Sequence, residues 1–122
     1  MNSKKDLTTE QKFILEQEGT EAPGTSALNY EKRKGTYHCV GCDTKLFDSE
    51  SKYESGSGWP SFFKSLPNVF ETKIDKNLGY ARTEYHCKIC GGHHGHIFDD
   101  GPQPTGKRYC NNGLALIFKE KK

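Results

Sequence analysis

Short apolar stretches separated by turn residues dominate the chain from residue 36 onward. Runs rich in β-branched and aromatic residues, bounded by glycine, proline, asparagine or aspartate, are typical of strands. The predicted strands are residues 36–40, 69–74, 79–86, 96–98, 107–111 and 114–119. The 13 glycines and 5 prolines agree with many turns and short strands. The pattern therefore predicts a mainly β, antiparallel domain.

The N-terminal segment has a helical pattern instead. Thr8 and Gln11 have the spacing of a capping box, in which each side chain accepts a hydrogen bond from the other residue's backbone N–H. A helix is predicted over residues 9–18, ending at Gly19, with Phe13 and Ile14 as its buried contacts. A short helical turn is expected within residues 26–34. Residues 1–6 are polar and are expected to be frayed.

Size and charge restrict the class of protein. A chain of 122 residues predicts one domain, residues 1–122, and a hydrophobic fraction of 32% predicts a small core. The net charge is +2, and the pI of about 8.2 is below the strongly basic pI that is typical of a nucleic-acid-binding domain. No apolar run has the length of a membrane span or of a secretion signal. The expectation is a cytoplasmic monomer that binds neither nucleic acid nor membrane.

Four of the five cysteines form two C-x-x-C pairs, Cys39 with Cys42 and Cys87 with Cys90. Two such pairs supply the four thiolates of a tetrahedral zinc site, and no βαβ pattern supports a thioredoxin-like redox pair. The adjacent His38 is interpreted as a strand neighbour, as is the histidine before Cys87, because four thiolates complete the shell. One structural Zn²⁺ per chain, contributing about 10 kcal/mol or more, would offset the small core.

Cys110 is the only thiol outside these pairs. On a strand, residues two apart share a face, so Arg108, Cys110 and Asn112 are expected to point the same way. A guanidinium beside a thiol favours the nucleophilic thiolate. A buried cysteine that acts as a small apolar side chain is the alternative, and the flanking residues leave both interpretations open.

Two further motifs are candidates for chemistry. His93, His94 and His96 form a cluster that could hold a second metal or donate protons near neutral pH, with one of the three serving the structure. Trp59, the only tryptophan, follows the glycine-rich run 55–58. It is either a wall of a small-substrate site or part of the core.

Together, these motifs resemble the methionine sulfoxide reductases of the B type, which act on the R epimer at sulfur. The matching stretches are residues 19–21, 35–42, 55–62, 93–98, 100–102 and 108–112, in family order over about residues 8 to 118. The resemblance implies two antiparallel sheets, with the zinc remote from the active site. It also implies reduction of methionine R-sulfoxide, free or in proteins, to methionine.

The resemblance assigns roles to individual residues. Cys110 corresponds to the catalytic nucleophile, and the polar residues around the sulfoxide correspond to His93, His96 and Asn112. The substrate side is assigned to Trp59, which packs the methyl group, and to Arg108 and Phe98. The zinc ligands of the metal-containing subgroup correspond to Cys39, Cys42, Cys87 and Cys90.

Two positions depart from the family pattern. His94 stands where the motif often has leucine. Ser57 stands where many members carry the cysteine that resolves the oxidised nucleophile. A sulfenic acid formed on Cys110 would then need an external reductant, namely thioredoxin, glutaredoxin or a small thiol.

Two other functions remain open at this level. A non-catalytic, zinc-stabilised β module that binds a protein or nucleic acid explains the four cysteines and the small core. It does not explain the shared face of Arg108, Cys110 and Asn112, and rapid alkylation of Cys110 would argue against it. A second metal on the histidines with hydrolytic chemistry lacks a carboxylate partner, unless Asp99 or Asp100 turns inward.

Overall fold

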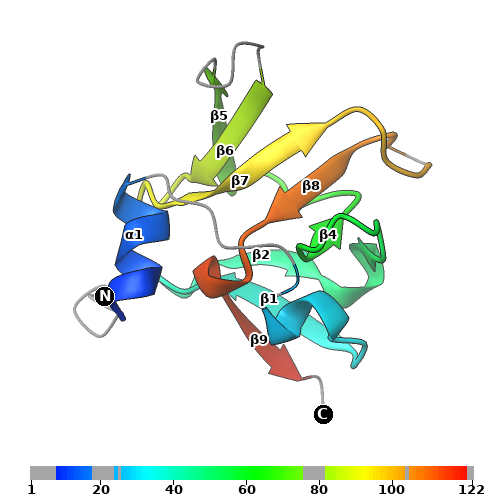
Figure 1. Ribbon diagram of the computed structural model, residues 1–122, viewed down its shortest axis with the longest axis horizontal. Coiled ribbons are helices and arrows are strands. Elements are labelled where there is room, and N and C mark those ends of the chain that lie inside the picture. The colour runs from blue at the N-terminus through cyan, green and yellow to red at the C-terminus, as the bar shows by residue number, and fades with distance from the viewer. Residues whose placement is uncertain (1–7, 18–23, 25, 76–81, 104, 121–122) are drawn as a thin grey trace.

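The computed structural model describes residues 8–17, 24, 26–75, 82–103 and 105–120 of the chain. Within these residues the strands form two antiparallel sheets beside a single α-helix (Figure 1). The larger sheet has the strand order β3-β4-β8-β7-β6-β5, and the smaller sheet has the order β2-β1-β9. The prediction of a mainly β fold with two antiparallel sheets and an N-terminal helix is confirmed.

The elements have the following bounds. Helix α1 spans Thr9–Gln17, and the smaller sheet contains β1 (Gly35–Cys39), β2 (Lys45–Asp48) and β9 (Leu116–Glu120). The larger sheet contains β3 (Lys52–Tyr53), β4 (Ser61–Phe62), β5 (Phe70–Asp75), β6 (Arg82–Cys87), β7 (His93–Phe98) and β8 (Arg108–Asn111). Short 3₁₀ turns lie at Ala27–Tyr30, Ser49–Ser51 and Gly113–Ala115. Each predicted strand overlaps an observed one, whereas β2, β3 and β4 were not predicted because they are too short to show a period.

Helix α1 begins with the predicted capping box. The Gln11 backbone N–H donates to Thr8 Oγ1 at 3.1 Å, and the Thr8 N–H donates to Gln11 Oε1 at 2.9 Å. Ile14 and Leu15 are buried, but Phe13 is 48% exposed, so the prediction for Phe13 was wrong. The helix turns its Ile14–Leu15 side to the sheets, and Phe13 falls on the solvent side. The predicted helix end at Gly19 and the N-terminal residues 1–6 lie outside the described residues.

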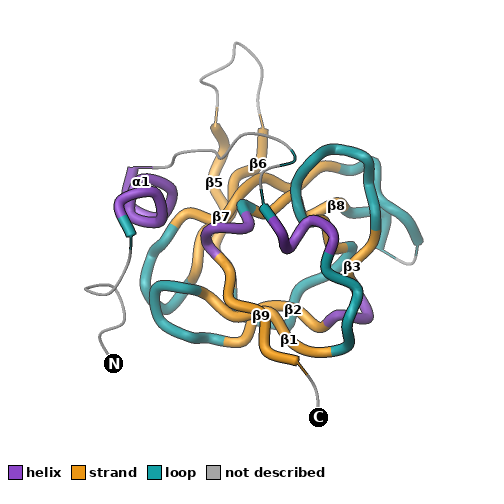
Figure 2. The backbone as a smooth tube through the Cα atoms, turned by 60° about the horizontal axis from the view of Figure 1, so that its bottom comes forward, coloured by secondary structure: helices purple, strands orange, loops and turns teal. Residues whose placement is uncertain are grey.

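The core between the sheets is mostly aromatic. Figure 2 shows the two sheets on opposite sides of the interior. Phe47 of β2 stacks on Phe62 of β4 with ring centroids 3.9 Å apart, and Tyr37 meets Phe62 edge-on at 5.0 Å. Large rings bury much apolar area per residue, which is how a chain with few hydrophobic residues fills this space. At nine residues α1 is short, and no described helix has the length and apolar character that a membrane span requires.

Candidate active site and metal centre

A row of polar side chains crosses the face of the larger sheet that is turned away from the core. The strand register pairs Ser61 of β4 with Cys110 of β8, Cys110 with His96 of β7, and His96 with Glu84 of β6. Directly paired residues on antiparallel strands place their side chains on the same face. The register therefore brings a thiol, an imidazole and a carboxylate from distant parts of the sequence into one row.

A cavity of about 80 Å³ opens at this row. Its lining includes five of the predicted site residues, namely Trp59, His96, Phe98, Cys110 and Asn112. Cys110 is partly exposed rather than enclosed in the core. A partly exposed thiol beside an indole and an imidazole can react with the end of a side chain that enters the cavity. Trp59 accordingly lies at the site and not in the core.

Two other lining residues, Arg82 and Gly95, were not singled out from the sequence. Gly95 lies so close to β8 that an added Cβ would approach the Cys110 carbonyl oxygen to 1.9 Å. Only glycine permits this close pairing of β7 with the strand that carries the thiol. Gly95 was missed because the strand predicted here began only at residue 96, whereas β7 begins at His93. Arg82 has no local signal, since its position depends on the register of β6.

Arg108 lies beside this cavity and carries a fixed positive charge. Its Nε and Nη2 donate to the two carboxylate oxygens of Asp100 at 2.8 and 3.1 Å, and its guanidinium carbon lies 4.3 Å from the Phe98 ring centroid. The hydrogen bond to Asp100 raises the pKa of Arg108, with a smaller contribution from the negative charge of Cys110. The guanidinium of Arg108 and the Cys110 sulfur are therefore close enough to interact electrostatically.

The histidine cluster is divided by a β-bulge in β7. Tyr85 pairs with Gly95 and His86 pairs with His93, which leaves His94 as the extra residue. The bulge reverses the alternation of side chains at this point. The rings of His93 and His96 lie together, with centroids 5.6 Å apart, whereas His94 is fully buried.

His93 lies next to the cavity, in a neighbouring hollow with Glu84 and Lys73. Its Nδ1 is 2.8 Å from Glu84 Oε2, and both side chains are only 4% exposed. Lys73 Nζ approaches the other carboxylate oxygen of Glu84 at 3.7 Å. The buried carboxylate thus lies at ion-pair distance from the His93 ring. Glu84 was not found from the sequence, because only the strand register places it opposite His96.

His94 belongs to the core side of the sheet. Burial lowers the pKa of His94 to about 3, so the ring is neutral. Its Nε2 lies 3.3 Å from Cys39 Sγ and its Nδ1 lies 3.3 Å from Asn111 Nδ2. The three histidines thus do not converge, and the four cysteines form the one group of described residues with metal-ligand spacing.

Ser57 lies next to the thiol of Cys110. Its Oγ is 3.9 Å from Cys110 Sγ, and it is held by Ser55 Oγ at 2.8 Å, which in turn bonds to Ser61 Oγ at 2.7 Å. The loop folds back over the sheet because Gly56 and Gly58 adopt φ values of 76° and 94°, which favour glycine. The side chain at position 57 is therefore within a short movement of Cys110 Sγ.

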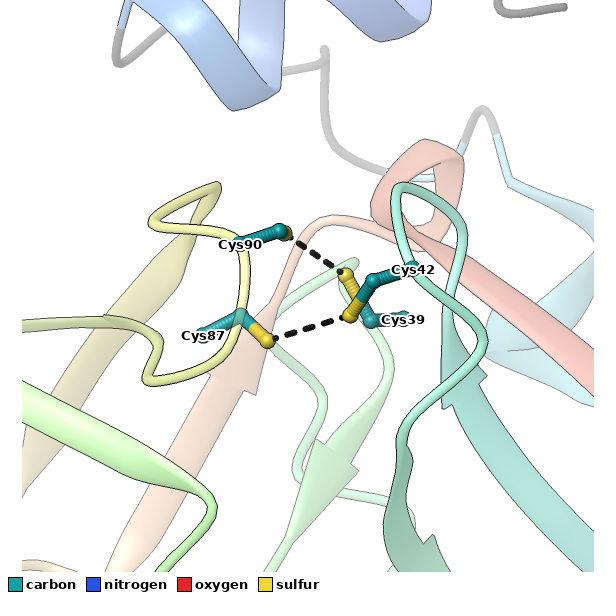
Figure 3. A group of neighbouring side chains, drawn as sticks. All are labelled: Cys39, Cys42, Cys87 and Cys90. Atoms are coloured by element: carbon teal, nitrogen blue, oxygen red, sulfur yellow. Dashed lines mark hydrogen bonds between the residues drawn. The ribbon is translucent and has the colours of Figure 1, made fainter. Parts of the chain in front are cut away.

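The two C-x-x-C turns meet at the ends of β1 and β6 (Figure 3). The Sγ atoms of Cys39 and Cys90 are 3.6 Å apart, those of Cys42 and Cys87 are 3.5 Å apart, and all four lie within 4.8 Å of one another. A tetrahedral zinc with bonds of about 2.3 Å requires sulfur–sulfur separations of about 3.8 Å. The four thiols therefore fit a zinc ion.

The surroundings of the cluster support a metal rather than four free thiols. Hydrogen bonds with Cys87 and Cys90 raise the pKa of the Cys39 thiol, so four thiolates coexist here only around a cation. His38 points elsewhere, with its ring nitrogens 2.8 Å from Thr36 Oγ1 and 3.0 Å from the Asp43 carbonyl oxygen. It is a strand neighbour of the ligands, as the sequence predicts.

Comparison with known proteins gives a consistent result. The family described as the SelR domain matches residues 7–120. A protein of Leptospira interrogans named peptide methionine sulfoxide reductase MsrB is 52% identical over 118 residues, which cover 96% of this chain and 90% of that protein. Proteins of the same name from Methanosarcina barkeri and Pseudomonas putida are 49% and 50% identical, over 95% and 93% of this chain and 82% and 86% of their own lengths.

Proposed function

The chain belongs to the SelR domain family, and from this membership we propose that it reduces methionine R-sulfoxide, free or in proteins, to methionine. The relatives named peptide methionine sulfoxide reductase support an oxidoreductase of this class. The observation that carries the proposal is that Cys110, His96, Trp59 and Asn112 all line one cavity. The choice of the R epimer rests on the family resemblance.

The chemical step is a two-electron exchange between two sulfur atoms. The Cys110 thiolate attacks the sulfoxide sulfur, and the sulfoxide oxygen gains a proton as negative charge develops on it. The oxygen passes to Cys110, so a thiol and a sulfoxide become a sulfenic acid and a thioether. The sulfoxide sulfur is reduced by two electrons and Cys110 is oxidised by the same two.

The neighbouring side chains divide the remaining tasks. His96 lines the cavity with Cys110 and is the proposed proton donor to the sulfoxide oxygen, while the ring of His93, which lies at ion-pair distance from Glu84, packs against the His96 ring. Trp59 receives the substrate methyl group. The remaining members of the proposed site are Arg108, Asn112 and Phe98. Their proposed roles are to orient the substrate and to favour the thiolate form of Cys110.

Replacing His96 tests its role as the proton donor. We expect His96→Asn to lower the rate of methionine formation roughly 10²-fold, because general acid catalysis contributes at least that much. The measurement is the single-turnover rate with a methionine R-sulfoxide peptide. The matched control is His86→Asn, since His86 points to Glu71 at 3.6 Å and is a β6 residue outside the cavity. Unchanged turnover in His96→Asn, or an equal loss in both variants, would contradict the assignment.

Regeneration of Cys110 requires thiols from outside the chain. The sulfenic acid reacts with one external thiol to give a mixed disulfide and water, and a second thiol releases Cys110 with formation of a disulfide. Thioredoxin, glutaredoxin or a small thiol supplies these electrons in the proposal. The Ser57 hydroxyl, 3.9 Å from Cys110 Sγ, cannot replace a resolving thiol. The proposed enzyme is a monomer in a reducing compartment such as the cytoplasm.

A single turnover without reductant tests the function and the resolving position together. The wild type is expected to form one methionine per chain with the loss of one thiol. Ser57→Cys is expected to lose two thiols per methionine, because a sulfur at this position can close a disulfide with Cys110. Thiol titration and mass spectrometry of the peptide that carries Cys110 check both results. Formation of no methionine would overturn the function, and loss of two thiols in the wild type would mean that a metal-site cysteine acts as resolver.

We also propose that the ion at the four cysteines is zinc, one per chain. When bound, zinc contributes folding stability and is redox-inert, so it supplies no electrons to the reaction. The four sulfurs belong to the ends of β1 and β6, whereas Cys110 belongs to the outward face of β8. The metal thus supports the scaffold that presents Cys110.

A further inference from the structure

A series of buried, hydrogen-bonded polar groups runs from the four-cysteine site through β7 and β8 to β6. It begins at Cys39 Sγ, passes through the His94 ring and the Asn111 amide, and ends at the Tyr85 hydroxyl. The three non-cysteine residues are fully buried, with exposed fractions of 0%. A polar group buried this deeply lowers the stability of the fold unless its hydrogen bonds are made. Each hydrogen bond in this series therefore restricts the donor and acceptor roles of the next residue.

The orientation of the Asn111 amide follows from its partners. Its Nδ2 lies 2.9 Å from the Asn112 carbonyl oxygen, which can only accept a hydrogen bond. Its Oδ1 lies 2.7 Å from the Tyr85 hydroxyl, which donates to it. The same Nδ2 is 3.3 Å from His94 Nδ1, and an amide nitrogen can only donate. His94 Nδ1 must therefore be the unprotonated ring nitrogen.

The remaining ring nitrogen of His94 then carries the proton. A histidine ring keeps at least one N–H, and here this is Nε2–H, which lies 3.3 Å from Cys39 Sγ. The same sulfur also accepts from the Gly41 backbone N–H at 3.4 Å. Two N–H donors on one sulfur are suited to a thiolate, since hydrogen bonds to a charged acceptor are the stronger ones.

We propose that His94 is an outer-shell residue of the four-cysteine metal site, donating Nε2–H to the Cys39 thiolate and thereby retaining the metal. Outer-shell donors orient a ligand and disperse its charge, and their loss commonly lowers metal affinity about 10- to 100-fold. Donation to the sulfur also makes it a poorer nucleophile toward oxidants. The inference rests on the proposed zinc site but not on the proposed reductase activity.

The histidine next to Cys39 in sequence provides a matched comparison. The His38 ring bonds to Thr36 and to the Asp43 carbonyl, and it does not take part in the bonds that reach Cys39 Sγ in the described structure. His94 is far from Cys39 in sequence yet touches its sulfur. His94 contacts the Cys39 sulfur, whereas His38 is turned away from it. Comparing variants of the two residues therefore distinguishes loss of this hydrogen bond from a general effect of removing an imidazole.

The test is the rate at which zinc passes from the holoprotein to a chromogenic chelator. His94→Leu, which restores the residue often found in the family motif, is expected to release zinc at least about 10-fold faster than the wild type. His94→Gln keeps an N–H donor and is expected to stay within about 3-fold of the wild type. His38→Leu is expected to release zinc at the wild-type rate. Equal rates for His94→Leu and the wild type, or for His94→Leu and His38→Leu, would overturn the proposal.

A spectroscopic measurement on the unmodified sequence does not depend on any variant folding. In the protein loaded with cadmium-113 and labelled with nitrogen-15, we expect a scalar coupling between the metal and the Nε2 proton of His94, transmitted through the Cys39 sulfur. A role of His94 in packing alone would produce no coupling, and its absence would overturn the proposal. A wild-type protein that binds neither zinc nor cadmium would overturn the metal site itself, whatever its reductase activity.

Discussion

Cys110→Ser is expected to lower methionine sulfoxide reduction by at least about 10³-fold, while the fold and the metal site survive. The serine hydroxyl is not ionised near neutral pH, and loss of a catalytic nucleophile has effects of this size or larger. Cys110 lies in the wall of the cavity rather than in the core, so the smaller oxygen removes few packing contacts. The measurement is methionine formed from a methionine R-sulfoxide peptide with excess dithiothreitol.

The same variant separates an enzyme from a non-catalytic zinc module. An unchanged zinc content and a melting temperature within a few degrees of the wild type would show that the loss of activity is chemical. Rapid alkylation of the wild-type thiol at Cys110, absent in the variant, is the second readout. Retained turnover in Cys110→Ser would contradict the mechanism, and slow alkylation of Cys110 would favour the module.

Cys87→Ser is expected to have the opposite outcome, with loss of the metal and of the folded state. Cys87 is fully buried, and its Sγ lies 3.5 Å from that of Cys42 across the cluster. A structural zinc site contributes about 10 kcal/mol or more, and a whole domain is stable by only about 5–15 kcal/mol. Zinc content by mass spectrometry and thermal unfolding by circular dichroism measure the effect.

Cys110→Ser is the matched control for this experiment, because the same chemical change is made at a thiol outside the cluster. Treatment of the wild-type protein with a strong zinc chelator should reproduce the unfolding of Cys87→Ser. A metal-free Cys87→Ser protein with an unchanged melting temperature would contradict a structural role for the metal. In that case the aromatic core alone would hold the sheets together.

Features encoded within a few residues could be predicted from the sequence. The two C-x-x-C pairs indicated the metal cluster because ligand spacing is local, and the capping box of Thr8 and Gln11 indicated the start of α1 for the same reason. The face that α1 buries was less predictable. Its choice of Leu15 over Phe13 depends on the surface against which the helix packs, and Leu15 lies on Gly41 and Gly92 beside the cysteine turns.

The face of β7 on which each histidine lies could not be predicted, because it depends on a β-bulge. Strict alternation along β7 would place His94 and His96 on one face and His93 on the other. The extra residue reverses this order, so His93 joins His96 and His94 turns to the metal site. Glu84 was not predicted for a related reason. It lies opposite His96 only because of the register in which β6 and β7 pair.

The metal site also has a consequence for the chain entropy of the unfolded protein. It joins Cys42 to Cys87, which are 45 positions apart, and so closes a loop that contains Ser57 and Trp59. A cross-link across a loop of this length removes about 4 kcal/mol of conformational entropy from the unfolded chain. A chain that unfolds without releasing its metal therefore keeps the ends of β1 and β6 together. It begins refolding with one long-range contact between the two sheets already made, whereas the pairings of β1 with β9 and of β4 with β8 still have to form.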